Sequence, residues 1–440
     1  MSTTNINIPK PVIDYNDLLN QPTFKTINGN SILGSGDIVI ESFVLEGTNY
    51  LSVLAQDSPQ ANGLAVKDAY TIAQTMTPNG NALSQQNRVV ILLAPGLYSF
   101  DEASNGQFIV NTSYIDFQSL SGQRDVYFSS IEVLSENNGI DVRLNGIDTT
   151  VNSYYGHQAF AVSSSAGAFE NIIIKNCKGG NFSFSSFSSG FIGLYENCEA
   201  LDYSFCGNAN TIPPTGITGI PNYFFGLFNY GTFKNCNALN YSFCASDLLG
   251  ANMINYGIIE NCTSGEYSFC MANQGFVENH GTIRNCESQS NSFVNLQNGT
   301  MGIQANNIGN ILNCKGVLNC FAVHSGSWNS ISSAQNFGTI NNCIATGNSF
   351  CVNPVSSIGA NWGSIFNCTS TGSNSFMGRF GENSNKINNC LASSGLCSDN
   401  PAGIFDDMYR CTLTNSAFTV GATGGGRVVL GIDNTGVVNY

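Results

Sequence analysis

Charged side chains are scarce in this sequence of 440 residues. Asp, Glu, Lys and Arg make up only 10% of it, and the formal net charge is -14. A negative chain without a basic patch is repelled by phosphate backbones and anionic lipid surfaces, which argues against a nucleic-acid partner. The sequence also lacks an apolar run long enough to span a bilayer, and its start, MSTTNINIPKPVIDYND, lacks the apolar core of a secretory signal. We therefore expect a soluble chain made in the cytosol, without membrane insertion.

Motifs for metals and cofactors are also missing. The sequence has no C-x-x-C, H-E-x-x-H or EF-hand pattern, and its three histidines, His157, His280 and His324, are isolated. The stretch GATGGGR, from Gly421 to Arg427, lacks the Lys-Ser/Thr of a phosphate-binding loop and precedes a strand instead of a helix. We expect no metal and no cofactor, and we interpret 421–440 as a C-terminal strand cap.

What the sequence does contain is a repeat. An Asn-Cys pair recurs with its cysteine at Cys177, Cys198, Cys236, Cys262, Cys286, Cys314, Cys343, Cys368 and Cys390, and Cys411 follows Arg410 in the equivalent place. The mean spacing from Cys177 to Cys411 is 26 residues, which is typical of a solenoid whose repeats bury their apolar faces by stacking. Because 47 Gly and abundant Asn and Ser favour tight turns between short strands, the repeat predicts an all-β solenoid.

Each repeat also has a fixed internal spacing. A Phe follows the cysteine by seven residues in eight of the ten repeats, and Phe376 comes one residue late. The pattern N-x-G-x-[IF]-x-N-C begins at Asn229, Asn255, Asn279, Asn307, Asn336 and Asn361. Strand alternation then points one column inward, comprising Phe233, Ile259, Ile283, Ile311, Ile340, Ile365 and Ile387. The outward column includes Glu196, Lys234, Glu260 and Arg284, which predicts alternating charges on coils about 4.8 Å apart. His280 takes the place of Tyr230, Tyr256, Phe337 and Trp362, which predicts a stacking role for it.

The Asn-Cys pair has a physical explanation in such a coil. Asn tolerates left-handed backbone angles at a bend, and its amide can bond to the same amide one coil away. We therefore predict an internal asparagine ladder of Asn235, Asn261, Asn285, Asn313, Asn342 and Asn367. Cysteine is small and often buried, which predicts a thiol column of Cys236, Cys262, Cys286, Cys314, Cys343 and Cys368. Thiols that recur once per coil cannot converge tetrahedrally on zinc.

The repeat region, 170–420, resembles the right-handed parallel β-helix of the pectate-lyase-like superfamily, with its inward stacks of asparagine and apolar side chains. Upstream, GLAVKDAYTIAQTM (Gly63 to Met76) has one apolar helical face, and the strand RVVILLAPGLYSF (Arg88 to Phe100) follows it. This order is similar to the capping helix and first coil of β-helical spikes and lyases. We therefore interpret 49–169 as the capping helix with the first coils, and 170–420 as the regular repeats.

A second resemblance lies near the N-terminus. The segment DYNDLLNQPTFKTINGNSILGSGDIVI, from Asp14 to Ile40, is similar to one near the start of many phage and large-virus fibre proteins. It is too short to form a core of its own, so we interpret 1–48 as a trimerisation or particle-anchoring segment. The resemblance implies a viral fibre or spike of the tailspike type, located on the virion surface and synthesised in the host cytoplasm. It further implies a homotrimer that contacts other virion proteins through the N-terminus.

Length variation between repeats falls almost entirely between the Phe and the next N-x-G, so one edge of the solenoid carries the insertions. Variable loops on a rigid scaffold are the usual location of binding residues. We predict ligand-binding roles for Tyr223, Phe224, Phe225 and Trp328, whose rings can stack on the sugars of a host-surface glycan or contact a receptor. The competing interpretation is that these rings pack the loops onto the solenoid or fill a subunit contact.

An enzyme of the polysaccharide lyase or glycoside hydrolase class is the alternative. Such chemistry needs carboxylates, or a carboxylate and a base, close together on neighbouring coils. The best cluster is Asp406, Asp407 and Arg410, and Glu266 with Asp202 is a second pair that can lie close on the coil surface. A purely architectural capsid decoration protein is the third possibility. Host attachment by a non-enzymatic fibre is the function that we expect.

The cysteine pattern yields a testable prediction. The thiols should be mostly reduced, because small volume and not disulfide formation is what the repeated position requires. Cys286→Ala should lower the free energy of unfolding by about 1 to 2 kcal/mol through lost packing, measured by denaturant titration with and without reductant. An effect confined to oxidising conditions would contradict the packing role.

Overall fold

A computed structural model gives the fold of this chain. The residues that it describes are 44–46, 49–100, 108–135, 140–150, 160–164, 171–181, 183–186, 193–202, 204–205, 226–249, 252–296, 304–321, 323–324, 333–347, 349–350, 359–372, 382–383, 387–393, 408–414, 428–429, 431–433 and 436–438. The chain divides into Met1–Phe43 and Val44–Tyr440, and the first unit lies outside the described residues. The anchoring role of 1–48 and the boundaries at 49, 170 and 421 stay predictions.

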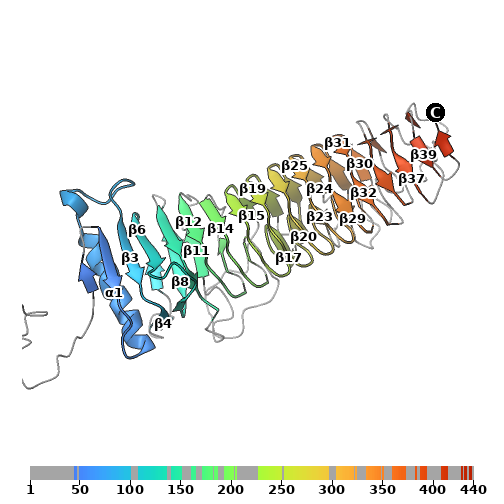
Figure 1. Cartoon of the computed structure of the whole chain (residues 1–440). Coiled ribbons are helices and arrows are strands. Elements are labelled where there is room, and N and C mark those ends of the chain that lie inside the picture. Colours follow the sequence, from blue (N-terminus) through green and yellow to red (C-terminus); the bar gives the residue numbers. More distant parts are fainter. Residues whose placement is uncertain are drawn as a thin grey trace, which may run out of the picture. The chain divides into compact units, whose positions relative to one another are not determined.

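The unit from Val44 to Tyr440 is an all-β solenoid of stacked coils, as the repeat predicts (Figure 1). The longest sheet runs in the order β1 Val44–Glu46, β2 Tyr50–Val53, β3 Val89–Leu93, β6 Ile115–Ser119, β9 Val142–Asn145, β12 Ile172–Lys175, β14 Gly193–Glu196, β16 Thr232–Lys234, β19 Ile258–Glu260, β22 Thr282–Arg284, β25 Asn310–Leu312, β28 Thr339–Asn341, β31 Ser364–Phe366, β34 Ile387–Asn388, β36 Met408–Tyr409 and β38 Val428–Val429. Its strands pair in parallel, except that β1 is antiparallel to β2. The right-handed sense of the coil stays a prediction.

Shorter sheets form the other sides of the coils. Near the N-terminal end they comprise β10 Ile147–Asp148, β7 Val126–Phe128 and β4 Gly96–Tyr98, and then β13 Ser185–Ser186, β11 Phe160–Ser164, β8 Ile131–Ser135 and β5 Phe108–Val110. Further along are β15 Gly226–Asn229, β18 Asn252–Asn255, β21 Val277–Asn279, β24 Gln304–Asn307, β27 Ser333–Asn336, β30 Gly359–Asn361 and β33 Glu382–Asn383, and beside them β17 Ala245–Leu249, β20 Met271–Gln274, β23 Asn295–Leu296 and β26 Val323–His324. The last sheet comprises β29 Ile344–Ala345, β32 Thr369–Ser370, β35 Leu391–Ala392, β37 Thr412–Leu413, β39 Gly431–Asp433 and β40 Gly436–Val438.

The one α-helix of the described residues, α1 Pro59–Thr75, packs at the N-terminal end of the stack, and the short 3-10 helix η2 Pro78–Gly80 follows it (Figure 1). The α-helix begins four residues before the predicted start, because the Ser58 hydroxyl accepts the Ala61 N–H and Pro59 occupies the first turn. Its buried face includes Tyr70, whose ring meets Phe108 edge-on at 5.4 Å between centroids. The capping helix is thus confirmed. The strand predicted over 88–100 is instead two strands, β3 and β4, which a short turn separates.

Ladders of identical side chains run through the core in register. The inward column of the longest sheet, from Phe233 to Ile387, is fully buried, as predicted. The Phe that follows each cysteine forms a second column: Phe243 and Phe269 stack at 4.9 Å, and Phe269 and Phe293 also stack at 4.9 Å. These side chains are the apolar core of the solenoid. Each of them is buried only because the next coil covers it.

The N-x-G corner holds the coils together most closely. The backbone carbonyl of Asn255 accepts two hydrogen bonds from the next coil, from the N–H groups of His280 at 2.8 Å and Gly281 at 2.9 Å. A Cβ on Gly281 would overlap the carbonyl oxygen of Gly257, so only glycine fits there. The Asn side chains of this corner form a fully buried ladder, in which the Nδ2 of Asn255 donates to the Oδ1 of Asn279 at 2.8 Å. This buried amide ladder was not predicted from the sequence.

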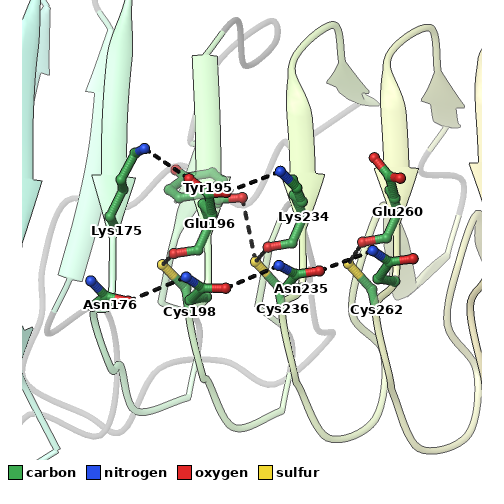
Figure 2. Close-up of polar contacts among 12 residues, drawn as sticks. Lys175, Asn176, Tyr195, Glu196, Cys198, Lys234, Asn235, Cys236, Glu260 and Cys262 are labelled. Atoms are coloured by element: carbon green, nitrogen blue, oxygen red, sulfur yellow. Dashed lines mark hydrogen bonds and ion pairs between the residues drawn. The ribbon is translucent and has the colours of Figure 1, made fainter.

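The ladder predicted at the Asn-Cys corner exists, but its internal location was wrong. Asn261, Asn285, Asn313, Asn342 and Asn367 are exposed, and Asn235 is half-buried. Each Nδ2 donates to the preceding coil, as from Asn285 to the Oδ1 of Asn261 at 3.0 Å. The acceptor is the equivalent asparagine, except that Asn367 donates to Asn341, the residue before Asn342, at 3.2 Å. Figure 2 shows the ladder where it passes Asn176 and Asn235. These residues have left-handed φ angles, such as 54° at Asn285, so the chain turns there and the amide points outward.

The cysteine beside each of these asparagines points inward. All cysteines in the described residues are buried thiols outside any disulfide, and the Sγ of Cys286 donates to backbone carbonyls at Arg284 (3.2 Å) and Ile259 (3.6 Å). Burial raises the pKa of the Cys177 thiol to about 12. The thiolate, which is the reactive form, is therefore suppressed there at neutral pH. Figure 2 shows three members of the column, Cys198, Cys236 and Cys262, on successive coils.

The two asparagine ladders should differ in their contribution to stability. Asn279→Ala leaves a buried amide of each neighbouring coil without its partner, so it should lower the free energy of unfolding by about 2 to 4 kcal/mol. Asn285→Gly keeps the left-handed bend at an exposed position and should cost less than about 1 kcal/mol. Denaturant titration of both variants measures the difference. Equal losses would show that burial of the ladder is not what matters.

Candidate functional site

Most of the residues predicted from the sequence to bind or catalyse lie outside the described part of the chain. This applies to Tyr223, Phe224, Phe225 and Trp328, and also to Asp406 and Asp407. Arg410 is described: it is exposed, with a left-handed φ of 52°, and it occupies the Asn position of the Asn-Cys corner. The ligand-binding role of the four aromatic residues and the Asp406, Asp407 and Arg410 cluster stay predictions.

Asp202 and Glu266 do not form a carboxylate pair. They occupy the same position of coils that are two apart, and Asn240 lies on the coil between them. The Oδ1 of Asp202 accepts the backbone N–H of Asn240 at 2.8 Å, and the Oδ1 of Asn240 accepts the backbone N–H of Glu266 at 2.8 Å. Two coil spacings, about 9.6 Å, separate the two acids. This separation was missed because the two residues were not aligned within the repeat.

The outward charges of the longest sheet form the predicted column of alternating sign. Glu196 is bonded to Lys175 at 2.8 Å on one side and to Lys234 at 3.1 Å on the other (Figure 2). The hydrogen bond from Lys175, followed by that from Lys234, holds the pKa of Glu196 below its usual value. Glu260 and Arg284 form another pair at 2.9 Å. These are solvated contacts that align neighbouring coils.

A buried ionic cluster on the first coils was not found from the sequence. The guanidinium of Arg88 donates two bonds to the Asp116 carboxylate, from Nε at 2.7 Å and from Nη2 at 2.5 Å, and a third to Asp141 at 2.7 Å. Asp116 also accepts the backbone N–H of Arg143 at 2.9 Å. Both carboxylates share one arginine, so the cluster keeps one net negative charge, and both are less than one-eighth exposed. Because each carboxylate is bonded to the guanidinium, this arrangement joins coils and does not resemble a catalytic pair of carboxylates. The three residues lie just before or within β3, β6 and β9. Their common place at the start of neighbouring strands is the feature from which the cluster could have been predicted.

The most extended surface feature is a column of outward side chains at the N-x-G corner. We call it the outer ridge, and it consists of Tyr230, Tyr256, His280, Ile308, Phe337 and Trp362. Its apolar and aromatic members other than His280 are each between 40% and 48% exposed. Tyr230 and Tyr256 stack at 4.9 Å between ring centroids, and Tyr256 and His280 stack at 4.8 Å, as the position of His280 in the repeat predicted.

In the outer ridge, Tyr256 presents the edge of its ring. Because Tyr256 lies between Tyr230 and His280 along the stack, both faces of its ring are covered by neighbours. A sugar that stacks on an aromatic side chain needs a free ring face. At Tyr256 the ridge is therefore suited to contact with an apolar surface, and not to face stacking on a saccharide.

The described residues contain no group of three or more His, Cys, Asp or Glu side chains that would hold a metal ion. No helix among them has the length and apolar character needed to cross a bilayer. Comparison of the chain with protein-family models, with curated proteins and with solved structures finds no match.

The Arg88 cluster yields a prediction that separates a buried ion pair from an exposed one. Arg88→Met removes the partner of two buried carboxylates and should lower the free energy of unfolding by about 3 to 5 kcal/mol. The matched variant Arg284→Met removes an exposed pair with Glu260 and should cost less than about 1 kcal/mol. Both values come from denaturant titration at neutral pH. A loss at Arg88 no greater than that at Arg284 would contradict a joining role for the cluster.

Proposed function

We propose that this protein is a structural subunit of a surface fibre or spike on a virus particle, where it attaches the particle to a host glycan or receptor. The observation that carries the proposal is the stack of parallel coils with a helix over its N-terminal end. Such a stack is stiff along its axis because its coils are bonded to their neighbours by strand pairing and, in the regular repeats, also by amide ladders. Stiffness over many coils is what a fibre needs.

The similarity of Asp14 to Ile40 to the start of viral fibre proteins supports the particle location. In the proposal the N-terminal segment contacts other virion proteins, and the shaft projects from the virion surface. The chain is synthesised in the host cytoplasm and assembles as a homotrimer of the tailspike type. A fold similar to pectate-lyase-like proteins does not by itself transfer their activity.

Attachment without cleavage is favoured over depolymerisation by the carboxylates of the described residues. Asp116 and Asp141 are both bonded to Arg88, and Asp202 and Glu266 lie two coils apart. In the first arrangement one guanidinium holds both carboxylates, and in the second Asn240 lies on the coil between the two acids and its N–H donates to Asp202. Neither arrangement therefore resembles the paired carboxylates of a glycosidase. In the proposal recognition resides in the loops between the Phe column and the N-x-G corner, with Tyr223, Phe224, Phe225 and Trp328 as contacts.

The test is to incubate the purified full-length chain with host-derived polysaccharides and to measure binding and product release together. We expect saturable binding without shortened oligosaccharides. Trp328→Ala and Tyr223→Ala should each weaken binding by about 10-fold, because each removes a stacking face. Tyr50→Ala, an exposed ring of β2, is the matched control and should leave binding unchanged. Release of oligosaccharides would replace attachment by depolymerisation, and absence of the chain from purified virions would refute the particle location.

A further inference from the structure

We propose that the outer ridge is the contact between copies of this chain, and that parallel copies meet along it about a common axis. The inference rests on the proposed function, since it assigns the surface through which the fibre subunits associate. It concerns the shaft and not the loops that carry recognition. It therefore has a test of its own.

The first argument is the continuity of the ridge. Its six members occupy the same position of six consecutive coils, and the strands on both sides of it pair in register through those coils. At about 4.8 Å per coil, the ridge is roughly 24 Å long. Isolated exposed apolar side chains are common on proteins, whereas a straight apolar column of this length marks an interaction surface.

The second argument is charge. The residues that flank the ridge on one side are the first residues of β16, β19, β22, β25, β28 and β31, and all six are uncharged. On the other side, in the next-to-last positions of β15, β18, β21, β24, β27 and β30, Glu278 is the one charged residue, and its carboxylate bonds to the His280 ring at 2.8 Å. The charged column of Lys234, Glu260 and Arg284 lies two residues beyond these first residues of β16, β19 and β22, and thus four residues beyond the ridge.

The neutral strip favours a second copy as its occupant. Each copy has a formal net charge of -14, so two copies repel one another over most of their surfaces. Close approach is least costly where neither chain presents charge, and the ridge is such a strip. A basic partner would instead be drawn to acidic side chains. The ridge has none, and the flanking Glu278 is already paired with His280.

The third argument is periodicity. A partner that contacts every member of the ridge has to present apolar side chains with the same spacing in a straight line, and a second solenoid with the same coils does so by construction. A large side chain has a full surface of about 150 to 250 Å². Because the members of the ridge are a little under half exposed, the exposed part of the ridge is roughly 500 Å² per chain. Two ridges together bury roughly 1,000 Å², the size at which specific interfaces begin. Three ridges on one axis bury the same area per chain, so the measured molar mass decides between two and three copies.

The experiment places acidic residues on the ridge. The double variant Tyr256→Glu and Phe337→Glu should weaken association by at least about 100-fold, because it buries like charges between copies. The matched control is Ile344→Glu with Leu391→Glu, two exposed apolar residues of the last sheet, which should assemble like the wild type. Light scattering at micromolar concentration gives the molar mass, and circular dichroism confirms that each variant is folded.

A cysteine variant tests the geometry without adding charge. Ile308 lies near the centre of the ridge, so copies that meet in register bring their Ile308→Cys thiols together. Air oxidation with a copper catalyst should then give covalently linked chains on a non-reducing gel, while Ile344→Cys should not. If the acidic double variant does not fold, the Ile308→Cys variant alone tests whether copies meet along the ridge.

The outcomes separate the inference from the proposed function. Loss of assembly in the ridge variant alone, with cross-linking in the Ile308→Cys variant alone, supports the inference. A monomeric wild type, or ridge variants that assemble as the wild type does, overturns it and leaves glycan binding by the loops untouched. Ridge-dependent assembly without any glycan binding supports the inference and overturns host attachment.

Discussion

The in-register hydrogen bonding between one coil and the next, at the N-x-G corner above all, is the constraint on which the rest of this structure depends. The carbonyl of Asn255 takes two N–H groups from the following coil, and the missing side chain of Gly281 lets the backbones approach that closely. Once this corner is fixed, strand alternation decides which side chain of each coil lies over its equivalent in the next. The thiol column, the phenylalanine stack and the outer ridge all follow from that superposition.

The same superposition explains why one repeat contains two asparagine ladders of opposite character. At the N-x-G corner the Asn has strand geometry and points into the core, where its amide has to be satisfied by other amides. At the Asn-Cys corner the Asn takes the left-handed conformation, the chain turns, and the amide faces solvent while the next side chain, cysteine, points inward. Asparagine is thus favoured at the N-x-G corner for its buried amide bonds, and at the Asn-Cys corner for its left-handed backbone.

The repeat in the sequence was sufficient to predict the solenoid, the inward column from Phe233 to Ile387 and the stacking of His280. The capping helix was predicted separately, from the apolar helical face of Gly63 to Met76. The repeat did not show whether the asparagine of the N-x-G corner or that of the Asn-Cys corner is buried. Strand alternation assigns inward and outward side chains only within a strand, and the left-handed residue at the bend interrupts it. The Arg88, Asp116 and Asp141 cluster joins residues 28 and 53 positions apart in the less regular first coils, where no repeat aligns them. The separation of Asp202 from Glu266 was available from the repeat and was overlooked.

The two ladders also run in opposite directions. In the buried ladder each Nδ2 donates towards the C-terminal end, as from Asn255 to Asn279, whereas in the exposed ladder it donates towards the N-terminal end, as from Asn285 to Asn261. Amides aligned head to tail add their dipoles, in the manner of peptide units in a helix. Each row leaves a partial positive charge at one end and a partial negative charge at the other. Because the two rows have opposed polarity, the end charges of one row are largely offset by those of the other where the rows overlap.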